Sequence, residues 1–290
     1  MNYRHVYHAG NFADVLKHLI LSLVITHLKR KTTPFRVIDT HAGAGLYDLS
    51  SPEAQKTGEW LEGIGRLLSA DLPASVAAAM APYLDVVRRF NLAAAGGAAG
   101  EGGRGDLLFY PGSPIIAAEL MRSQDYLIAN ELHPADFEAL GATMSAYSNV
   151  KVMNLDGYVA EKSVLPPKER RGVVLIDPPF EEPGELGRLF QGVRQGVKRF
   201  ANGTFLIWYP IKDPRPVAAF KRELAGLGLD KLTAVEFFRQ APDDLERLNG
   251  HGLVMLNAPF TLGDDLKEIL PVLVEILGRD KGAFFEITAL

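Results

Sequence analysis

Hydrophobic positions along the chain follow a helical pattern first and strand patterns afterwards. Between residues 11 and 31, apolar side chains recur every three or four residues, which predicts one amphipathic helix. A short apolar run at residues 35–39 then predicts a buried strand. Further strands are expected at residues 126–130, 150–154, 172–176, 204–209, 233–238 and 252–256, and helices at residues 115–122, 134–147, 185–200, 215–227 and 262–278.

This order of elements predicts an α/β fold with a mostly parallel, seven-stranded sheet covered by helices on both faces. The last two strands have no helix between them, so we expect an antiparallel pair at the sheet edge. Residues 47–108 interrupt the alternation with two or three helices, at residues 58–68 and 74–91, and with an Ala- and Gly-rich run at residues 93–105 that predicts a flexible loop. The expected units are residues 1–46 (tail, first helix and first strand), residues 47–108 (a helical insertion subdomain) and residues 109–290 (the remainder of the main domain).

Composition limits the chemistry. The 290 residues are 47% hydrophobic and include no cysteine, which excludes disulfides, thiolate-bound zinc, iron–sulfur clusters and a cysteine nucleophile. Net charge is −4, yet residues 1–36 carry six basic side chains and four histidines against the single acid Asp14, so this segment is predicted to be a basic patch. No apolar run near the start is long enough for a membrane span and no signal peptide is recognisable. We expect a cytoplasmic protein without membrane contact, and a monomer.

Polar residues gather where the predicted strands end. Asp39 and His41 follow the first strand, and Glu131, Asp156 and Asp177 follow three later ones. Ligands of such sheets bind beyond the carboxyl ends of the strands. The turn at residues 39–45 contains Gly43 and Gly45 but lacks the third glycine of a dinucleotide fingerprint, so by itself it is equally consistent with close packing.

Acids at two later strand ends favour the interpretation that this turn belongs to a nucleoside site. A carboxylate at the position of Glu131 typically accepts hydrogen bonds from the two ribose hydroxyls of a nucleoside. Asp156, on the following strand end, could then face the adenine amino group of a nucleoside cofactor.

The most informative motif is Asp177-Pro178-Pro179-Phe180. An amino group conjugated with a base is a poor nucleophile because its lone pair is delocalised. The Asp177 carboxylate and the Pro178 carbonyl could accept hydrogen bonds from that amino group and favour its pyramidal form, with the prolines restricting the backbone. Phe180 would stack on an extruded base. The alternative interpretation is a rigid turn with a surface acid.

The N-terminal stretch is dense in aromatic and basic residues. Tyr3 and His5, interleaved with Arg4, are suited to stacking on bases and pairing with phosphates. Lys17 and His18, one turn into the first helix, could reach the cofactor site. His5 and His8 could instead indicate a metal site, but without cysteines or a matching carboxylate pattern no metal is expected.

Together these motifs resemble the bacterial 23S ribosomal RNA adenine-N6 methyltransferases, a class I (Rossmann-like) family that uses S-adenosylmethionine. The resemblance covers nearly the whole chain, through YRHVYHAGNFADVLKH, DTHAGAG, TGEWLEGI, FYPGSP, ELHP, LDGY, LIDPPF and LIWYP. It implies 23S ribosomal RNA as partner and S-adenosylhomocysteine as product. Asp177, with Pro178 and Phe180, would be catalytic, Phe180 replacing the tyrosine often found there.

The same resemblance assigns the binding residues. The cofactor site would be lined by His18, His41, Gly43, Ser113, Glu131, Asp156, Gly157 and Asp177. Tyr3, His5 and Lys17 would belong to an N-terminal tail that closes over cofactor and RNA.

Three alternatives remain at this point. The same carboxylate and prolines would serve methyl transfer to guanine N2, DNA adenine or a protein glutamine amide. A non-catalytic RNA-binding protein would not need Asp177. An oxidoreductase using a dinucleotide is disfavoured by the incomplete glycine pattern.

Overall fold

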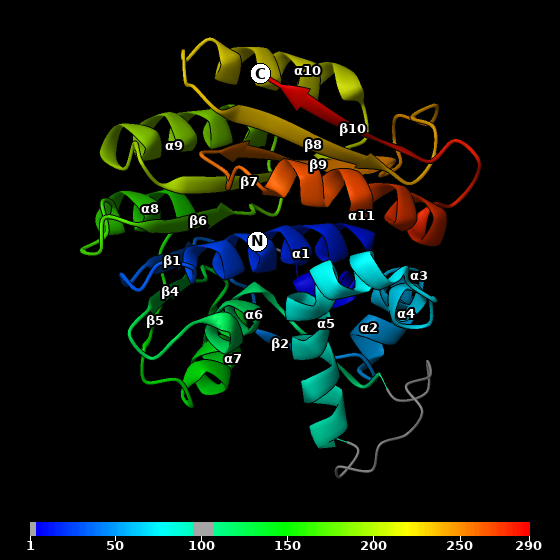
Figure 1. Ribbon diagram of the computed structural model, residues 1–290, viewed down its shortest axis with the longest axis horizontal. Helices are drawn as coiled ribbons and strands as arrows, with labels where there is room; N and C mark the ends of the chain where they lie inside the picture. The colour runs from blue at the N-terminus through cyan, green and yellow to red at the C-terminus, as the bar shows by residue number, and fades with distance from the viewer. Residues whose placement is uncertain (1–3, 95–106) are drawn as a thin grey trace.

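The computed structural model describes residues 4–94 and 107–290 and has an α/β fold built on one eight-stranded sheet (Figure 1). The strand order is β10-β8-β9-β7-β6-β1-β4-β5. Strands from β5 to β7 pair in parallel, whereas β9 is antiparallel to β7 and β8, and β10 is antiparallel to β8. The strands are β1 (Arg36–Asp39), β4 (Tyr126–Asn130), β5 (Val150–Met153), β6 (Gly172–Ile176), β7 (Thr204–Ile211), β8 (Leu232–Phe238), β9 (Gly250–Leu256) and β10 (Phe284–Ala289).

The expected number of seven strands in this sheet is wrong by one. The missing strand, β10, lies at the sheet edge, pairs only with β8 and keeps most of its side chains partly exposed, so its apolar pattern is weak. The antiparallel pair β8–β9 is present as expected. It does not form the edge, because β10 lies outside it.

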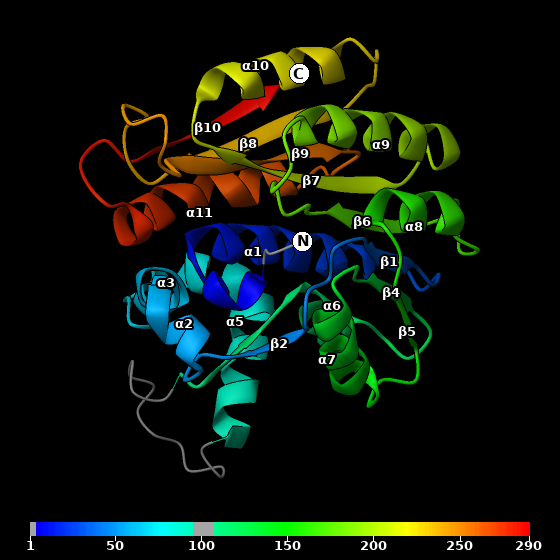
Figure 2. The same ribbon diagram turned by 180° about the vertical axis from the view of Figure 1, so that it is seen from behind.

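Helices cover both faces of the sheet (Figures 1 and 2). One face carries α1 (Phe12–Leu28), α6 (Ser113–Leu120), α7 (Pro134–Met144) and α11 (Leu262–Leu277), and the other carries α8 (Gly157–Val164), α9 (Glu185–Arg199) and α10 (Pro214–Ala225). Alternate residues of β6 supply the two cores: Val173 and Leu175 pack towards α1, and Val174 and Ile176 towards α9. None of the described helices combines the length and apolar composition needed to cross a membrane.

Helix α1 is buried on almost every side because α5, α6 and α11, as well as the sheet, pack against it. It begins at Asn11, whose side chain accepts hydrogen bonds from the amides of Ala13 and Asp14. Even its polar residues Asp14, Lys17 and His18 are at most 4% exposed. Buried charges need partners, so this helix must deliver its polar side chains to one another or to the site.

The insertion is closed by an antiparallel pair of short strands, β2 (Leu46–Asp48) and β3 (Phe109–Pro111). Its described helices are α2 (Pro52–Thr57), α3 (Glu59–Glu62), α4 (Ile64–Leu68) and α5 (Ala74–Ala94), one more than the largest number expected. The helix expected at residues 58–68 is divided at Gly63, where a Cβ atom would lie 2.1 Å from the Gly10 carbonyl oxygen. Helix α5 packs on α1, so the insertion shares the main core. The loop expected at residues 93–105 lies almost wholly outside the described residues.

Candidate active site

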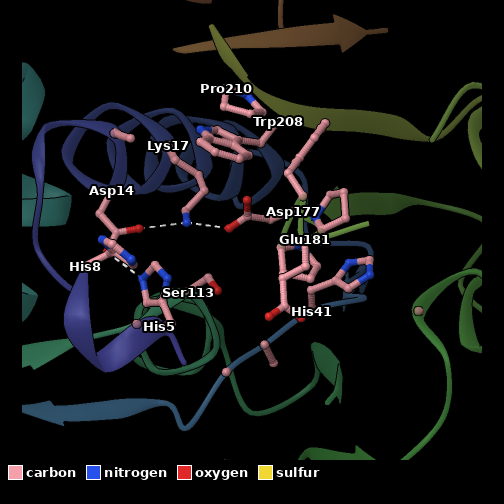
Figure 3. Close-up of a pocket in the computed structure, with 18 of the residues that line it drawn as sticks. His5, His8, Asp14, Lys17, His41, Ser113, Asp177, Glu181, Trp208 and Pro210 are labelled. Atoms are coloured by element: carbon pink, nitrogen blue, oxygen red, sulfur yellow. Dashed lines mark hydrogen bonds and ion pairs between the residues drawn. The ribbon is translucent and has the colours of Figure 1, made fainter. Parts of the chain in front are cut away.

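A pocket of about 570 Å³ opens at the carboxyl ends of the parallel strands (Figure 3). It is lined by the N-terminal segment, by α1 and by the turns that follow β1, β4, β5, β6 and β7. It brings together every described residue that was expected to be catalytic or to bind cofactor or RNA: His5, Lys17, His18, His41, Gly43, Ser113, Glu131, Asp156, Gly157, Asp177, Pro178 and Phe180. Asp39, the other polar residue expected at a strand end, is not part of the pocket lining. Tyr3 lies outside the described residues. A volume of this size is typical of small-molecule sites.

A hydrogen bond holds the turn after β1 against the Glu131 side chain. Gly43 has φ +61°, and a Cβ atom there would lie 2.0 Å from the Tyr47 hydroxyl, so only glycine fits. The Gly43 amide donates to Glu131 Oε2 at 2.8 Å, and the His133 amide donates to Oε1 at 2.7 Å. Burial raises the pKa of Glu131. The carboxylate is therefore held in one orientation at the pocket wall.

The start of α8 holds His41 in place. Asp156 Oδ1 accepts hydrogen bonds from the amides of Tyr158 and Val159, which caps the helix. At Gly157 a Cβ atom would lie 2.3 Å from His41 Nε2, so the absence of a side chain makes room for the imidazole. Burial lowers the pKa of His41 to about 4, which keeps the ring neutral at physiological pH.

The turn after β6 has an unusual backbone. Asp177 ends the buried strand, two prolines follow, and Phe180 adopts φ +52°, a left-handed conformation that costs energy in any residue other than glycine. The Phe180 ring meets Trp208 of β7 edge-on, with the centroids 5.7 Å apart. Both aromatic rings line the pocket beside the carboxylate. Such strain in a pocket wall is typical of a functional turn.

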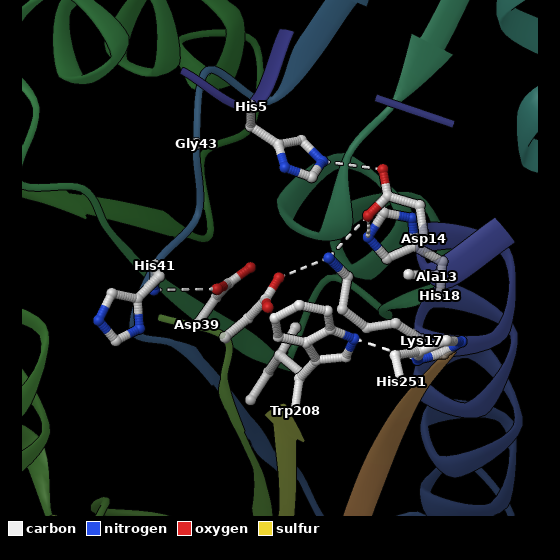
Figure 4. Close-up of polar contacts among 12 residues, drawn as sticks. His5, Ala13, Asp14, Lys17, His18, Asp39, His41, Gly43, Trp208 and His251 are labelled. Carbon is white, nitrogen blue, oxygen red and sulfur yellow. Dashed lines mark hydrogen bonds and ion pairs between the residues drawn. The ribbon is translucent and has the colours of Figure 1, made fainter. Parts of the chain in front are cut away.

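Lys17 lies between two carboxylates that are far apart in the sequence, those of Asp14 and Asp177 (Figure 3; Asp14 and Lys17 are also labelled in Figure 4). Its Nζ lies 2.7 Å from Asp14 Oδ1 and 2.5 Å from Asp177 Oδ2. Burial opposes the charge of Lys17, but the two carboxylates raise its pKa above the usual value. The family resemblance implied that Lys17 contacts RNA. In the structure its ammonium group contacts the Asp177 carboxylate and its side chain is almost entirely buried.

Asp14 is the residue that the sequence analysis missed. It is 1% exposed and also accepts hydrogen bonds from His5 Nε2 at 2.8 Å and from the Gly10 amide at 2.9 Å. Burial alone would raise the pKa of Asp14, but the charges of His5 and Lys17 hold it well below its usual value. The available signal was the spacing of Asp14 and Lys17, which places them one turn apart on the same helix face.

His18 lies behind this pair at the pocket wall. Its Nδ1 is hydrogen-bonded to the Tyr110 hydroxyl at 2.7 Å, and burial lowers its pKa to about 3. His8 is hydrogen-bonded to Glu59 at 2.9 Å. Among residues 4–94 and 107–290, no group of three histidine, aspartate or glutamate side chains is arranged to hold a metal ion.

The basic residues of the N-terminal segment do not form one patch, contrary to the expectation from sequence. Arg4 pairs with Asp136 near the pocket, with 3.5 Å between Nη2 and Oδ1, and Lys17 is buried. The exposed residues 29–31 follow the far end of α1 and precede β1, so they lie at the amino ends of the parallel strands. Only part of this charge is near the pocket.

Asp39, beside the pocket at the end of β1, has a buried oxygen, Oδ2, without a hydrogen-bond partner among the described residues. The residue as a whole is 1% exposed. Burial raises the pKa of Asp39 to about 7, although a hydrogen bond from Ser113 opposes this. An unpaired acceptor at the end of β1 is suited to a ligand that carries hydrogen-bond donors.

Asp39 is expected to make the ligand-free protein less stable as the pH rises. Its folded-state pKa of about 7 exceeds the ordinary value of 3.8, so between these values the folded chain retains a proton that the unfolded chain has lost. Asp39→Asn should therefore gain stability relative to wild type between pH 4 and pH 8, measured by urea unfolding at both values. Asp264→Asn, on the exposed face of α11, is the control. An Asp39→Asn effect that is the same at both pH values would contradict this assignment.

The doubly wound sheet, the glycine-containing turn beside Glu131 and the Asp-Pro-Pro-Phe turn in one pocket define a class I, S-adenosylmethionine-dependent methyltransferase. The chain belongs to the family of ribosomal RNA large subunit methyltransferase D, RlmJ, whose model matches residues 32–286. The family resemblance drawn from the motifs is thus confirmed.

Two relatives are similar over almost their whole length. Ribosomal RNA large subunit methyltransferase J of Haemophilus influenzae is 42% identical over 278 residues, which cover 96% of this chain and 94% of the relative. The protein of the same name from Escherichia coli is 40% identical, with 93% and 92% covered. The crystal structure of protein LPL1258 from Legionella pneumophila matches with a TM-score of 0.85 and 30% identity, covering 97% and 98% of the two chains.

Proposed function

We propose that this protein transfers a methyl group from S-adenosylmethionine to the N6 amino group of an adenine in 23S ribosomal RNA. The observation that carries the proposal is the strained Asp177–Phe180 turn on one side of the pocket. The turn after β1, with Gly43 hydrogen-bonded to Glu131, forms another side. The relatives named above are ribosomal RNA methyltransferases. The pocket thus offers room for a nucleoside cofactor and, beside it, for a second planar base.

The residues of the pocket wall fit the cofactor. The oriented Glu131 carboxylate can accept hydrogen bonds from the ribose hydroxyls. Asp156 caps α8 with Oδ1, so its other oxygen can accept a hydrogen bond from an adenine amino group. Asp39, with its unpaired oxygen, can accept from the ammonium group of the methionine part. The neutral rings of His18 and His41, together with Ser113, Gly43 and Gly157, complete the cradle. No metal enters the proposal.

Asp177 would act on the target base. Lys17 is bonded to Asp177 Oδ2, which leaves Oδ1 to accept a hydrogen bond from the adenine N6 amino group, with the Pro178 carbonyl as the second acceptor. When bound, S-adenosylmethionine supplies a methyl carbon to the N6 lone pair and leaves as S-adenosylhomocysteine. The N6 nitrogen becomes acidic after this attack and loses one proton to Asp177 or water. Positioning and hydrogen bonding then account for most of the rate.

The aromatic pair would hold the extruded adenine. Phe180 and Trp208 border the pocket beside Asp177, and a base stacked on an aromatic ring gains about 1–3 kcal/mol. Tyr3 and His5 would contact the RNA from the N-terminal segment. His5 is hydrogen-bonded to Asp14, and Asp14 pairs with Lys17, so a movement of His5 on contact with RNA would shift Lys17 as well.

The test is methyl transfer from labelled S-adenosylmethionine to ribosomal RNA from cells that lack the enzyme, followed by nucleoside analysis. We expect label in N6-methyladenosine of the 23S RNA. Label in N2-methylguanosine would retain the pocket assignment but overturn the adenine target. No label in ribosomal RNA, DNA or protein, despite binding of the cofactor, would overturn the catalytic role altogether.

A further inference from the structure

A second groove adjoins the pocket on the outside of α8 and α9. It has a volume of about 460 Å³ and shares Tyr158 and Arg188 with the pocket, so the two hollows are adjacent. Its remaining lining includes Lys162 of α8 and Gln191 and Gln195 of α9. Besides three glycines, the lining thus consists of two cations, two amide side chains and one aromatic ring, which are groups that bind a nucleic-acid strand.

The two helices approach closely because α9 presents small residues to α8. At Gly192 a Cβ atom would lie 2.5 Å from the Tyr158 ring, and at Gly196 it would lie 1.9 Å from Glu161 Oε1. Larger side chains at either position would separate α8 from α9. The shallow groove therefore depends on these two glycines.

The exposed charge on these two helices is of one sign, although Arg188 also pairs with the buried Glu185. Each helix has a single acid, Glu161 in α8 and Glu185 in α9, and these are only 1% and 6% exposed. The basic residues of the two helices are Lys162, Arg188, Arg194, Lys198 and Arg199. All five keep contact with solvent, and the four of α9 are exposed. A face with five cations and two buried acids stands out on a chain whose net charge is −4.

The pocket mouth has the opposite character. Glu181 and Glu182, in the turn before α9, line the pocket and are exposed. Acids at the mouth repel a phosphodiester backbone, so the mouth can admit a base but binds the flanking phosphates poorly. The attraction for a polyanion must come from elsewhere. Helices α8 and α9 lie side by side (Figure 2), and the groove on them shares Tyr158 and Arg188 with the pocket.

We propose that the α8–α9 groove is the path of the RNA strand flanking the target adenine. Lys162 and Arg188 in the groove, and Lys198 one turn beyond Gln195 on α9, would contact successive phosphates, and the two glutamines would contact sugar or base edges. This inference rests on the proposed function. The 15 residues of α9 span about 22 Å, long enough for several nucleotides of an extended strand. Two exposed basic side chains beyond the end of α8, Lys168 and Arg170, precede β6 and would continue the path.

The test is the double variant Lys162→Gln/Lys198→Gln, which removes two cations but leaves the catalytic pocket intact. Loss of two phosphate contacts should raise the KM for ribosomal RNA about 10-fold at physiological salt and reduce the slope of log KM against log salt by about 1.4. The kcat at saturating RNA and the affinity for S-adenosylmethionine should not change. Lys267→Gln/Lys281→Gln, with the same change of net charge but on and after α11 on the other face, is the matched control and should behave as wild type.

The outcomes separate the two proposals. Wild type that transfers no methyl to ribosomal RNA overturns the proposed function. Wild type that is active, with the groove variant and the control showing equal KM and salt slope, overturns only the groove. A groove variant impaired on ribosomal particles but not on naked RNA overturns the RNA path as well and assigns this face to a ribosomal protein.

Discussion

Asp177→Asn is expected to lower kcat for methyl transfer about 100- to 1000-fold, with little change in the affinity for S-adenosylmethionine. The amide keeps the size of the side chain but loses the charge that would hold the N6 amino group, and removal of one such stabilising group typically costs this much. The expected change lies in kcat because the carboxylate acts on the target base beside the cofactor site. Single-turnover transfer of labelled methyl, together with calorimetric titration of the cofactor, measures both quantities.

The control for this prediction is Asp230→Asn, an exposed residue that precedes β8 and does not line the pocket. It should retain wild-type kcat. Asp177→Asn activity within a factor of three of wild type would rule out a catalytic role for this carboxylate, provided that thermal unfolding shows both variants to be folded.

Lys17→Met is expected to lower the free energy of unfolding by about 3 kcal/mol near neutral pH and to abolish most methyl transfer. Breaking a buried ion pair by removing one partner leaves a charge without compensation, and the typical cost is 3–5 kcal/mol. Here Asp14, at 1% exposure, would lose the Lys17 ammonium group and keep the hydrogen bonds from His5 and the Gly10 amide. Equilibrium urea unfolding at pH 7.5 measures the loss.

The loss should shrink as the pH falls. The pKa of Asp14 is depressed in the folded state, so its stabilising contribution is present above the ordinary value of 3.8 and is lost as the pH falls through the folded value. Wild type loses this contribution in acid and the variant has little of it to lose, so the two stabilities converge. A Lys17→Met deficit that is independent of pH would show that packing of the lysine stem, and not its charge, is responsible.

The matched control is Lys267→Met on α11. Lys267 also pairs with an aspartate three residues before it, Asp264, at 3.0 Å, but both side chains are mostly exposed. Solvent screens such a pair, so the change in stability should stay within about 0.5 kcal/mol. The contrast between the two lysines isolates the effect of burial.

Much of the site could be predicted because its motifs are short and local in the sequence. Asp177–Phe180 and the turn at Gly43 are short, contiguous motifs, and each directly follows an apolar run that predicts a strand. Because parallel strands have their carboxyl ends at the same edge, predicting the strands was enough to bring Glu131, Asp156 and Asp177 together. The pocket contains all of them.

Other features could not be predicted because they depend on contacts between distant segments. Lys17 and Asp177 are 160 positions apart, and nothing local to either residue indicates the other. The burial of α1 results from the helices α5, α6 and α11 that pack over it, so its charged residues look like an exposed basic segment in the sequence. The same holds for Glu161 and Glu185, whose burial leaves the α8–α9 face basic.

The sequence by itself determined the class of fold, the positions of seven strands along the chain and the chemical groups of the pocket, because hydrophobic periodicity and short turn motifs are local properties. The tertiary structure decided the eighth strand, since β10 is stabilised by pairing with β8 and not by its own apolar pattern. It also decided which charges are paired, buried or exposed. Those properties depend on the surroundings of a side chain, and the surroundings are supplied by segments far away in the chain.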